Sequence, residues 1–175
     1  MCAVVAAVGV AYAMNRFVGR VLDPPKIEVR AKMTEAGDGF FRDVPAGSFA
    51  CSDKQLRSKG FVSCTAVIVD YGDEALFFHA LPANSTGPQK DETINCCNVV
   101  AVLEKELRAR HIPIADCSVI LDSGERLDYF RVARRLERHG FKIDNRSGFE
   151  DERARDVFYD PATSTLRVKY AQARS

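Results

Sequence analysis

The stretch Val62-Ser-Cys-Thr-Ala-Val-Ile-Val-Asp-Tyr71 is rich in β-branched residues and almost continuously apolar, which is typical of a buried strand. A second apolar segment, Ala75-Leu-Phe-Phe-His-Ala-Leu81, follows it across Gly72-Asp73. A Gly-X pair between two strands favours a tight hairpin turn. We therefore expect an antiparallel hairpin at the centre of the fold.

Further strands are expected on both sides of this hairpin. They are Ile27–Lys32 and Ser48–Ser52 before it, and Cys117–Leu121, Lys142–Asp144, Ala154–Asp160 and Thr165–Tyr170 after it. An order of strands first, followed by helices alternating with strands, indicates an α+β fold with a mixed sheet. The fold class we expect is a mixed β-sheet sandwich flanked by helices.

Two segments show helical periodicity. Asp91 can cap a helix that runs to about Arg110. Asp122 and Glu125 have the spacing of a capping box before a second helix, which runs to about His139 and ends at Gly140. The apolar positions are Ile94, Cys97, Val100, Leu103 and Leu107 in the first helix, and Leu127, Phe130, Ala133 and Leu136 in the second.

The composition excludes several classes of function. Lys and Arg number 25 and Asp and Glu 24, so the net charge of +1 lacks the basic excess that a nucleic-acid partner requires. The six Cys show no CxxC spacing and the three His are scattered, so we expect no metal site and no disulfide framework. No cofactor is expected either. A chain of 175 residues can bury a core without these supports.

The first 26 residues form an apolar leader, separate from a domain that we expect at 27–175. Residues 2–14 carry no charge, and Asp23-Pro24-Pro25 breaks the chain after them. This run is shorter than the roughly 20 residues that cross a bilayer, and no basic segment precedes it as in a secretory signal. Three interpretations stay open: a segment packed in the protein or on a partner, a membrane contact through residues 1–22, and a cleaved signal. We expect a cytoplasmic monomer, with membrane association through the leader as the alternative.

The hairpin brings a thiol and an imidazole to one face of the sheet. If the chain turns at Gly72-Asp73, the numbers of paired residues sum to 145, so His79 lies opposite Ala66 and Cys64 opposite Leu81. Cys64 and His79 are then diagonal neighbours on one face, with Cα atoms about 7 to 8 Å apart. A slip of one residue would put them on opposite faces.

A cysteine beside a histidine suits nucleophilic catalysis, because an imidazole that takes the thiol proton yields the reactive thiolate. The alternative is structural. A Cys in an apolar strand is usually a small core residue, and a single His on a strand is often a hydrogen-bonded structural residue. Spacing alone leaves both interpretations open.

Two segments resemble the signature sequences of the CheD family, the chemoreceptor glutamine deamidases. They are Phe61-Val-Ser-Cys-Thr-Ala-Val-Ile-Val-Asp-Tyr71 and His79-Ala-Leu-Pro82. In that family one strand opens with Gly-Ser-Cys and the next ends in His-x-Met/Leu-Pro. The order of elements is similar from about Ile27 onward, and bacterial toxin deamidases such as the cytotoxic necrotizing factors share the fold and the Cys-His pair.

The resemblance implies roles for individual residues. Cys64 would be the nucleophile and His79 the general base, while Ser58 stands where the family has a Thr six residues before the Cys. Backbone amides near Ser63 and Cys64 would hold an oxyanion. The chain departs from the family at Val62, which replaces a Gly, and at residues 148–155, an acidic and bulkier loop where the family has a glycine-rich turn.

The function expected from the resemblance is cysteine-dependent deamidation of a glutamine in a protein substrate, without a metal or cofactor. The chemotaxis-like and the toxin-like roles both stay open. An alternative is a protein of the same fold that binds and regulates a partner with weak or no catalysis. A cysteine peptidase is a third interpretation, without any peptidase segment in its favour.

Overall fold

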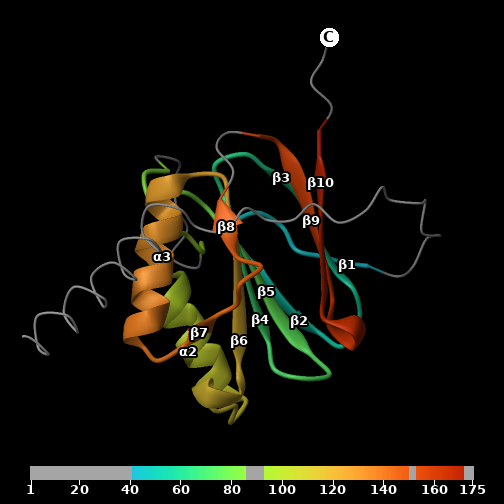
Figure 1. The fold of residues 1–175 in the computed structure, drawn as a ribbon, viewed down its shortest axis with the longest axis vertical. Coiled ribbons are helices and arrows are strands. Elements are labelled where there is room, and N and C mark those ends of the chain that lie inside the picture. The colour runs from blue at the N-terminus through green and yellow to red at the C-terminus, as the bar shows by residue number, and fades with distance from the viewer. Residues whose placement is uncertain (1–40, 86–92, 150–152, 172–175) are drawn as a thin grey trace, which may run out of the picture.

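The computed structural model describes residues 41–85, 93–149 and 153–171, which build three layers (Figure 1). Two helices cover one face of a six-stranded sheet, and a four-stranded sheet packs against its other face. Both sheets are mixed. The expected α+β class is therefore confirmed, as two mixed β-sheets with two helices.

The six-stranded sheet contains the central hairpin. Its strands are β2 (Phe49–Ser52), β5 (Ala75–Ala80), β4 (Thr65–Asp70), β6 (Ser118–Ser123) and β7 (Lys142–Ile143) in spatial order, with β8 (Gly148–Phe149) also paired to β6. The pairs β2–β5, β5–β4 and β4–β6 are antiparallel, whereas β7 and β8 run parallel to β6.

The four-stranded sheet brings together segments that are far apart in the chain. Its order is β1 (Arg42–Asp43), β3 (Leu56–Phe61), β9 (Arg155–Asp160) and β10 (Thr165–Tyr170). Strands β9 and β10 form a hairpin across a short 3-10 helix, Pro161–Thr163. A second 3-10 helix, Ile114–Asp116, precedes β6.

The register of the central hairpin agrees with the sequence prediction. Thr65 pairs with Ala80 and Ala66 with His79, so the paired numbers sum to 145. Gly72 has φ of 109°, a conformation that L side chains rarely adopt, and it provides the turn. The expected register is confirmed.

The two faces of the hairpin belong to two cores. Val67, Val69 and Phe78 pack with the helices, whereas Ala66, Ile68 and Phe77 pack with the four-stranded sheet. This division follows from the period of two in side-chain direction along a strand. Both faces are buried, which explains why the first segment is apolar almost without interruption.

The first helix is shorter than expected. Helix α2 spans Val99–Ala109. The residues before it are bound to other groups: the N–H of Ile94 donates to the Gly47 carbonyl, and the Asn95 side chain accepts the N–H of Cys97. These bonds hold the segment as a turn against β5, so Ile94 and Cys97 are not helical; Asp91 lies outside the described residues.

The second helix, α3 (Arg126–Arg138), ends as predicted but begins differently. Gly140 has φ of 85° directly after the helix, as a C-terminal glycine should. The capping box was wrong: Asp122 belongs to β6 and forms an ion pair with Arg155, and the N-cap residue Glu125 makes no side-chain cap bond.

The apolar face of α3 is also shifted from the expected one. Tyr129, Val132 and Leu136 are buried, whereas Leu127 is 68% exposed. The helix is oriented so that Asp128, which follows Leu127, points into the protein and is 2% exposed. Leu127 therefore does not belong to the core that its spacing predicted.

The remaining strand predictions agree in part. Strand β4 is shorter than the predicted 62–71 because Val62 and Ser63 lie in a bend, and β6 extends two residues beyond Leu121. Strands β1, β3 and β8 were not predicted. The leader and the strand expected at Ile27–Lys32 lie outside the described residues. Among the described helices, none has the length and apolar character to cross a membrane.

We predict that Gly124→Ala destabilises the protein. A Cβ atom on Gly124 would lie 1.6 Å from the Val62 carbonyl oxygen, a backbone atom that cannot rotate away. Such overpacking should lower the free energy of unfolding by about 3 kcal/mol. Urea unfolding followed by circular dichroism measures the change.

Gly60→Ala is the matched control. A Cβ there meets nothing within 4 Å, although φ is 75°. Its cost should be only the left-handed backbone penalty of about 1 kcal/mol. Equal unfolding midpoints for Gly124→Ala and the parent protein would contradict the close approach at Gly124.

Candidate active site

Cys64 and His79 lie on the same face of the six-stranded sheet. Cys64 comes directly before β4 and packs against the core between the two sheets. His79 pairs with Ala66 and is 1% exposed, and its ring stacks on Phe61 of β3 with 3.8 Å between ring centroids. The expected sharing of a face is confirmed. No hydrogen bond joins the Cys64 thiol to His79 within the described part of the chain.

Ser58, the third residue that the resemblance singled out, lies against the histidine. Its Oγ is 2.7 Å from His79 Nδ1 and 2.5 Å from the Val44 carbonyl oxygen. A carbonyl can only accept, so the single hydroxyl proton goes to Val44, and Nδ1 must donate its proton to Ser58. This assigns the Nδ1–H tautomer and leaves a lone pair on Nε2.

The environment keeps His79 neutral at physiological pH. Burial and, to a smaller extent, the positive charge of Arg155 together lower the pKa of its imidazole to about 4. Nε2 is buried and has no hydrogen-bond partner among the described residues. An unpaired buried nitrogen is costly, and it is the atom that a general base requires.

The Cys64 thiol is half-buried and also neutral. Burial raises the pKa of the thiol, the nearby charge of Arg155 lowers it, and the charge of Asp128 raises it. The free protein therefore holds a neutral thiol and a neutral imidazole rather than a thiolate and an imidazolium. Catalytic hydrogen bonds that are loose in a free enzyme often tighten when substrate binds.

Arg155 is the residue of this region that the sequence prediction missed. Its guanidinium is fully buried and its Nε lies 2.8 Å from a carboxylate oxygen of Asp122, which is also fully buried. The other guanidinium nitrogens donate to the carbonyls of Val62 (3.3 Å) and Cys64 (3.4 Å). The guanidinium also lies over the ring of Phe61, which stacks on His79.

A sequence signal for the Arg155–Asp122 pair was present. In β9, the period of two places Arg155 on the same face as Val157 and Tyr159, both of which are buried. In β6, Asp122 shares a face with Ile120. A charge at a core position of each of two strands indicates a buried ion pair, because an unpaired buried charge is too costly.

The bend before β4 offers backbone donors beside the thiol. The N–H groups of Ser63 and Cys64 donate to no acceptor in the described ranges, and the Cys64 carbonyl accepts the N–H of Gly124 at 3.0 Å. With Val62 in place of the glycine of the CheD signature, the chain thus still adopts a conformation in which these two N–H groups have no acceptor in the described ranges. Free N–H groups near a nucleophile are the donors that can hold an oxyanion.

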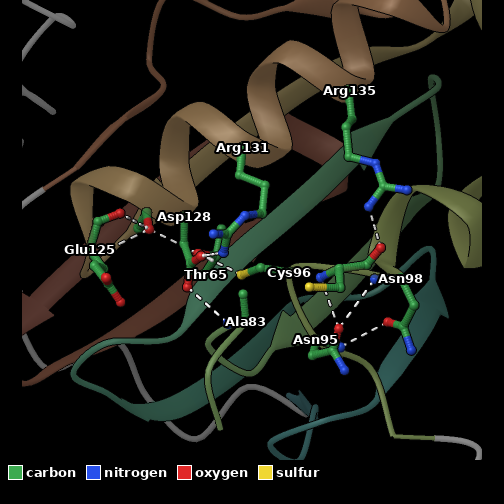
Figure 2. A network of polar contacts seen from close by, with 11 residues as sticks. Thr65, Ala83, Asn95, Cys96, Asn98, Glu125, Asp128, Arg131 and Arg135 are labelled. Carbon is green, nitrogen blue, oxygen red and sulfur yellow. Dashed lines mark hydrogen bonds and ion pairs between the residues drawn. The ribbon is translucent and has the colours of Figure 1, made fainter.

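A polar network on the helix side of the sheet holds the segments around Cys64 together (Figure 2). The Asp128 carboxylate accepts the N–H of Ala83, in the loop that follows β5, and pairs with Arg131. Thr65, the residue after Cys64, exchanges a hydroxyl hydrogen bond of 2.8 Å with Ser123 at the end of β6. The network therefore connects the loop after β5, and the adjoining ends of β4 and β6, to the beginning of α3.

The other described cysteines are free thiols without evident chemistry. Cys96 is buried and its thiol donates to Thr65 at 3.4 Å; burial raises the pKa of Cys96 to about 12. Within residues 41–85, 93–149 and 153–171, no three His, Cys, Asp or Glu side chains gather in a group able to hold a metal ion.

A surface hollow of about 240 Å³ lies away from this chemistry. It occupies the outer face of the four-stranded sheet and is lined by residues such as Phe41, Arg57 and Phe158. Those residues alternate with Ser58 and Arg155, which point to the inner face. The hollow does not reach the thiol or the imidazole.

A scan against protein-family models gives no match, and a search of the curated proteins gives none either.

We predict that Asp122→Asn is strongly destabilising and that replacing both partners is not. The single change leaves the buried Arg155 guanidinium without its carboxylate, which should cost about 3–5 kcal/mol. The double variant Asp122→Leu with Arg155→Met should recover at least half of that loss, because no buried charge remains. Urea unfolding of the three proteins tests this, and a double variant less stable than Asp122→Asn would contradict it.

We also predict that His79 makes the protein less stable in acid. The unfolded imidazole takes up a proton below its ordinary pKa of 6.5, whereas the buried one does so only near 4. Stability is therefore lost as the pH falls from about 6.5 to about 4, and the part due to His79 reaches about 3 kcal/mol.

His79→Gln should remove that part of the pH dependence. Urea unfolding of both proteins at pH 7 and pH 4.5 isolates it, because the other titrating groups are common to both. If the stability of the parent and the variant falls equally between the two pH values, the histidine is not buried in its neutral form.

Proposed function

We propose that the protein is a cysteine-dependent protein-glutamine deamidase with a CheD-like fold. It would hydrolyse the side-chain amide of a glutamine in a target protein to glutamate and release ammonia. Cys64 is the nucleophile, His79 the general base, and Ser58 the residue that orients the base. No metal or cofactor takes part in the proposed reaction.

The observation that carries the proposal is the Ser58–His79 hydrogen bond of 2.7 Å. It fixes the tautomer whose free lone pair is on Nε2, the nitrogen needed to accept a thiol proton. The histidine, the hydroxyl and the half-buried thiol face the same inter-sheet region. The three residues are also those implied by the resemblance to the CheD family.

In the proposed mechanism the thiol loses its proton only as it reacts. Nε2 of His79 accepts the Cys64 proton while sulfur bonds to the carboxamide carbon, and the oxyanion is held by the N–H groups of Ser63 and Cys64. The tetrahedral intermediate breaks its C–N bond, and the imidazolium gives its proton to the departing nitrogen, which leaves as ammonia.

Water then completes the reaction. His79 removes a proton from a water molecule that attacks the thioester carbon, and the C–S bond breaks to release the glutamate side chain. The thiolate recovers its proton from the imidazolium, so the enzyme returns to its neutral pair. The charge of Arg155, which lowers the thiol pKa against the effect of burial, stabilises the sulfur while it is negative.

A second candidate is a protein of this fold that binds and regulates a partner without catalysis. Two observations favour it: burial raises the pKa of Cys64, and no hydrogen bond links this thiol to His79 in the described residues. In that case Cys64 is a packing residue, and its replacement by Ser has no effect beyond stability.

The deciding experiment is mass spectrometry of a synthetic library of heptapeptides, each with one glutamine, after incubation with the protein. Deamidation appears as a gain of about 1 Da and release of ammonia. We expect Cys64→Ser and His79→Ala to lower the rate at least 100-fold, in line with loss of a nucleophile or a general base.

Cys97→Ser is the matched control, since Cys97 is an exposed thiol outside the site. It should retain the parent rate. Deamidation by Cys64→Ser at the parent rate would refute the proposal, and absence of deamidation by the parent protein on the whole library would favour the binding protein.

A further inference from the structure

Strand β10 forms one edge of the four-stranded sheet, because within the described residues it pairs only with β9. The N–H of Ala171, directly after β10, donates to the Ala154 carbonyl, so the hydrogen bonds to β9 are made by Ala171 and every second residue before it. The N–H and C=O groups of Leu166 and Val168 therefore point away from β9. They have no hydrogen-bond partner in the described part of the chain.

The side chains of β10 divide between a charged face and an apolar face. Arg167 and Lys169 lie on the outer face of the sheet, where they line the hollow beside Phe158. Leu166 and Val168 point to the opposite face, and Leu166 packs against the core between the sheets. Both apolar side chains are only half-buried. The edge is thus cationic on one face and apolar on the other.

The two cations of this edge are not neutralised by the sheet itself. Arg167 lies opposite Phe158, and Lys169 lies opposite Asp156. The Asp156 carboxylate accepts the N–H of Gly60 at 3.0 Å, and neither cation forms an ion pair or a side-chain hydrogen bond among the described residues. Complementary charges fix the orientation of a partner and disfavour wrong ones, so an anionic partner suits this face.

A second copy of β10 does not fit this edge. If two copies paired antiparallel about Val168, Arg167 of one copy would lie opposite Lys169 of the other. Like charges directly opposite each other destabilise a pair of strands. Cations on an edge strand also protect proteins against pairing of identical edges. The occupant that matches the edge therefore differs from β10 in the sign of its charge.

We propose that β10 binds an extended acidic segment of a partner protein as an added strand. Such a segment places acidic side chains opposite Arg167 and Lys169 and apolar side chains opposite Leu166 and Val168. Its backbone hydrogen-bonds to the two outward-facing residues, which is how peptides extend the edge of a sheet. A nucleic acid would meet the cations but leave the backbone groups and the apolar side chains without a complement. The inference is independent of the proposed function, because it involves no residue of the candidate active site.

The test measures the affinity of three fluorescein-labelled peptides of seven residues for the full-length protein. Valine alternates with glutamate in the first, with glutamine in the second and with lysine in the third. At low ionic strength we expect the glutamate peptide to bind about fivefold more tightly than the glutamine peptide, since partly exposed ion pairs add modestly to affinity. The advantage should shrink at high ionic strength, where such pairs are screened. Equal binding of the three peptides, or binding of none, would overturn the inference.

Reversal of the charges on β10 gives the sharper result. In Arg167→Glu with Lys169→Glu, the lysine peptide should become the tightest binder. Arg134→Glu with Arg138→Glu is the control, because it makes the same change of charge at exposed positions of α3 and should keep the preference of the parent. A preference that survives in the β10 variant, or that also reverses in the α3 variant, contradicts binding at β10.

A proline at Val168 tests whether a strand is added. Val168→Pro removes an outward N–H but no hydrogen bond to β9, and it should weaken binding of the glutamate peptide at least tenfold. Val168→Thr keeps the N–H and should bind as the parent does; circular dichroism checks that each variant is folded. Binding by Val168→Pro at the parent affinity would overturn the proposal, because charge alone would then hold the peptide. Tighter binding of a thymidine oligonucleotide than of the glutamate peptide would overturn it in favour of a nucleic-acid site.

Discussion

The arrangement of this region depends on one buried ion pair, between Arg155 of the four-stranded sheet and Asp122 of the six-stranded sheet. Neither charge can be buried alone, because the desolvation cost of each is several kcal/mol. The guanidinium has five N–H donors. Nε donates to the carboxylate, and the two terminal nitrogens donate to the backbone carbonyls of Val62, Arg153 and Cys64. The position of the Cys64 segment is therefore set by a charge on the other sheet.

The same charge lowers the pKa of both His79 and Cys64, but it acts with burial at the histidine and against burial at the cysteine. A neutral base with an unpaired Nε2 and a thiol that is stabilised as it becomes negative are suited to proton transfer during attack rather than before it. A thiolate formed in advance would need an imidazolium partner, which the burial of His79 disfavours.

The sequence was sufficient to predict how neighbouring strands pair, but it was insufficient to predict the contacts between the two sheets. The Gly72-Asp73 turn and the period of two determine the register of the hairpin, so His79 opposite Ala66 could be predicted. Strand β3 has the sequence Leu-Arg-Ser-Lys-Gly-Phe, whose hydrophobic pattern is weak, and it is defined by pairing with β9 about 100 residues later. Ser58 could therefore be assigned only by resemblance. The capping box failed because the Asp122 spacing suited a helix start equally well, and the long-range pair with Arg155 decided its position.

The two sheets divide the components of the proposed site between them. The six-stranded sheet supplies Cys64 and His79, and the four-stranded sheet supplies Ser58, which is hydrogen-bonded to His79, and Arg155, which is hydrogen-bonded to the Cys64 carbonyl. Either sheet alone would hold only half of the chemistry: an imidazole without a fixed tautomer, or a hydroxyl and a guanidinium without a nucleophile. Since the interface between the sheets is also a hydrophobic core, any change that separates them should remove reactivity together with packing. The proposed active site is therefore a property of the closed sandwich and not of the hairpin that carries the thiol.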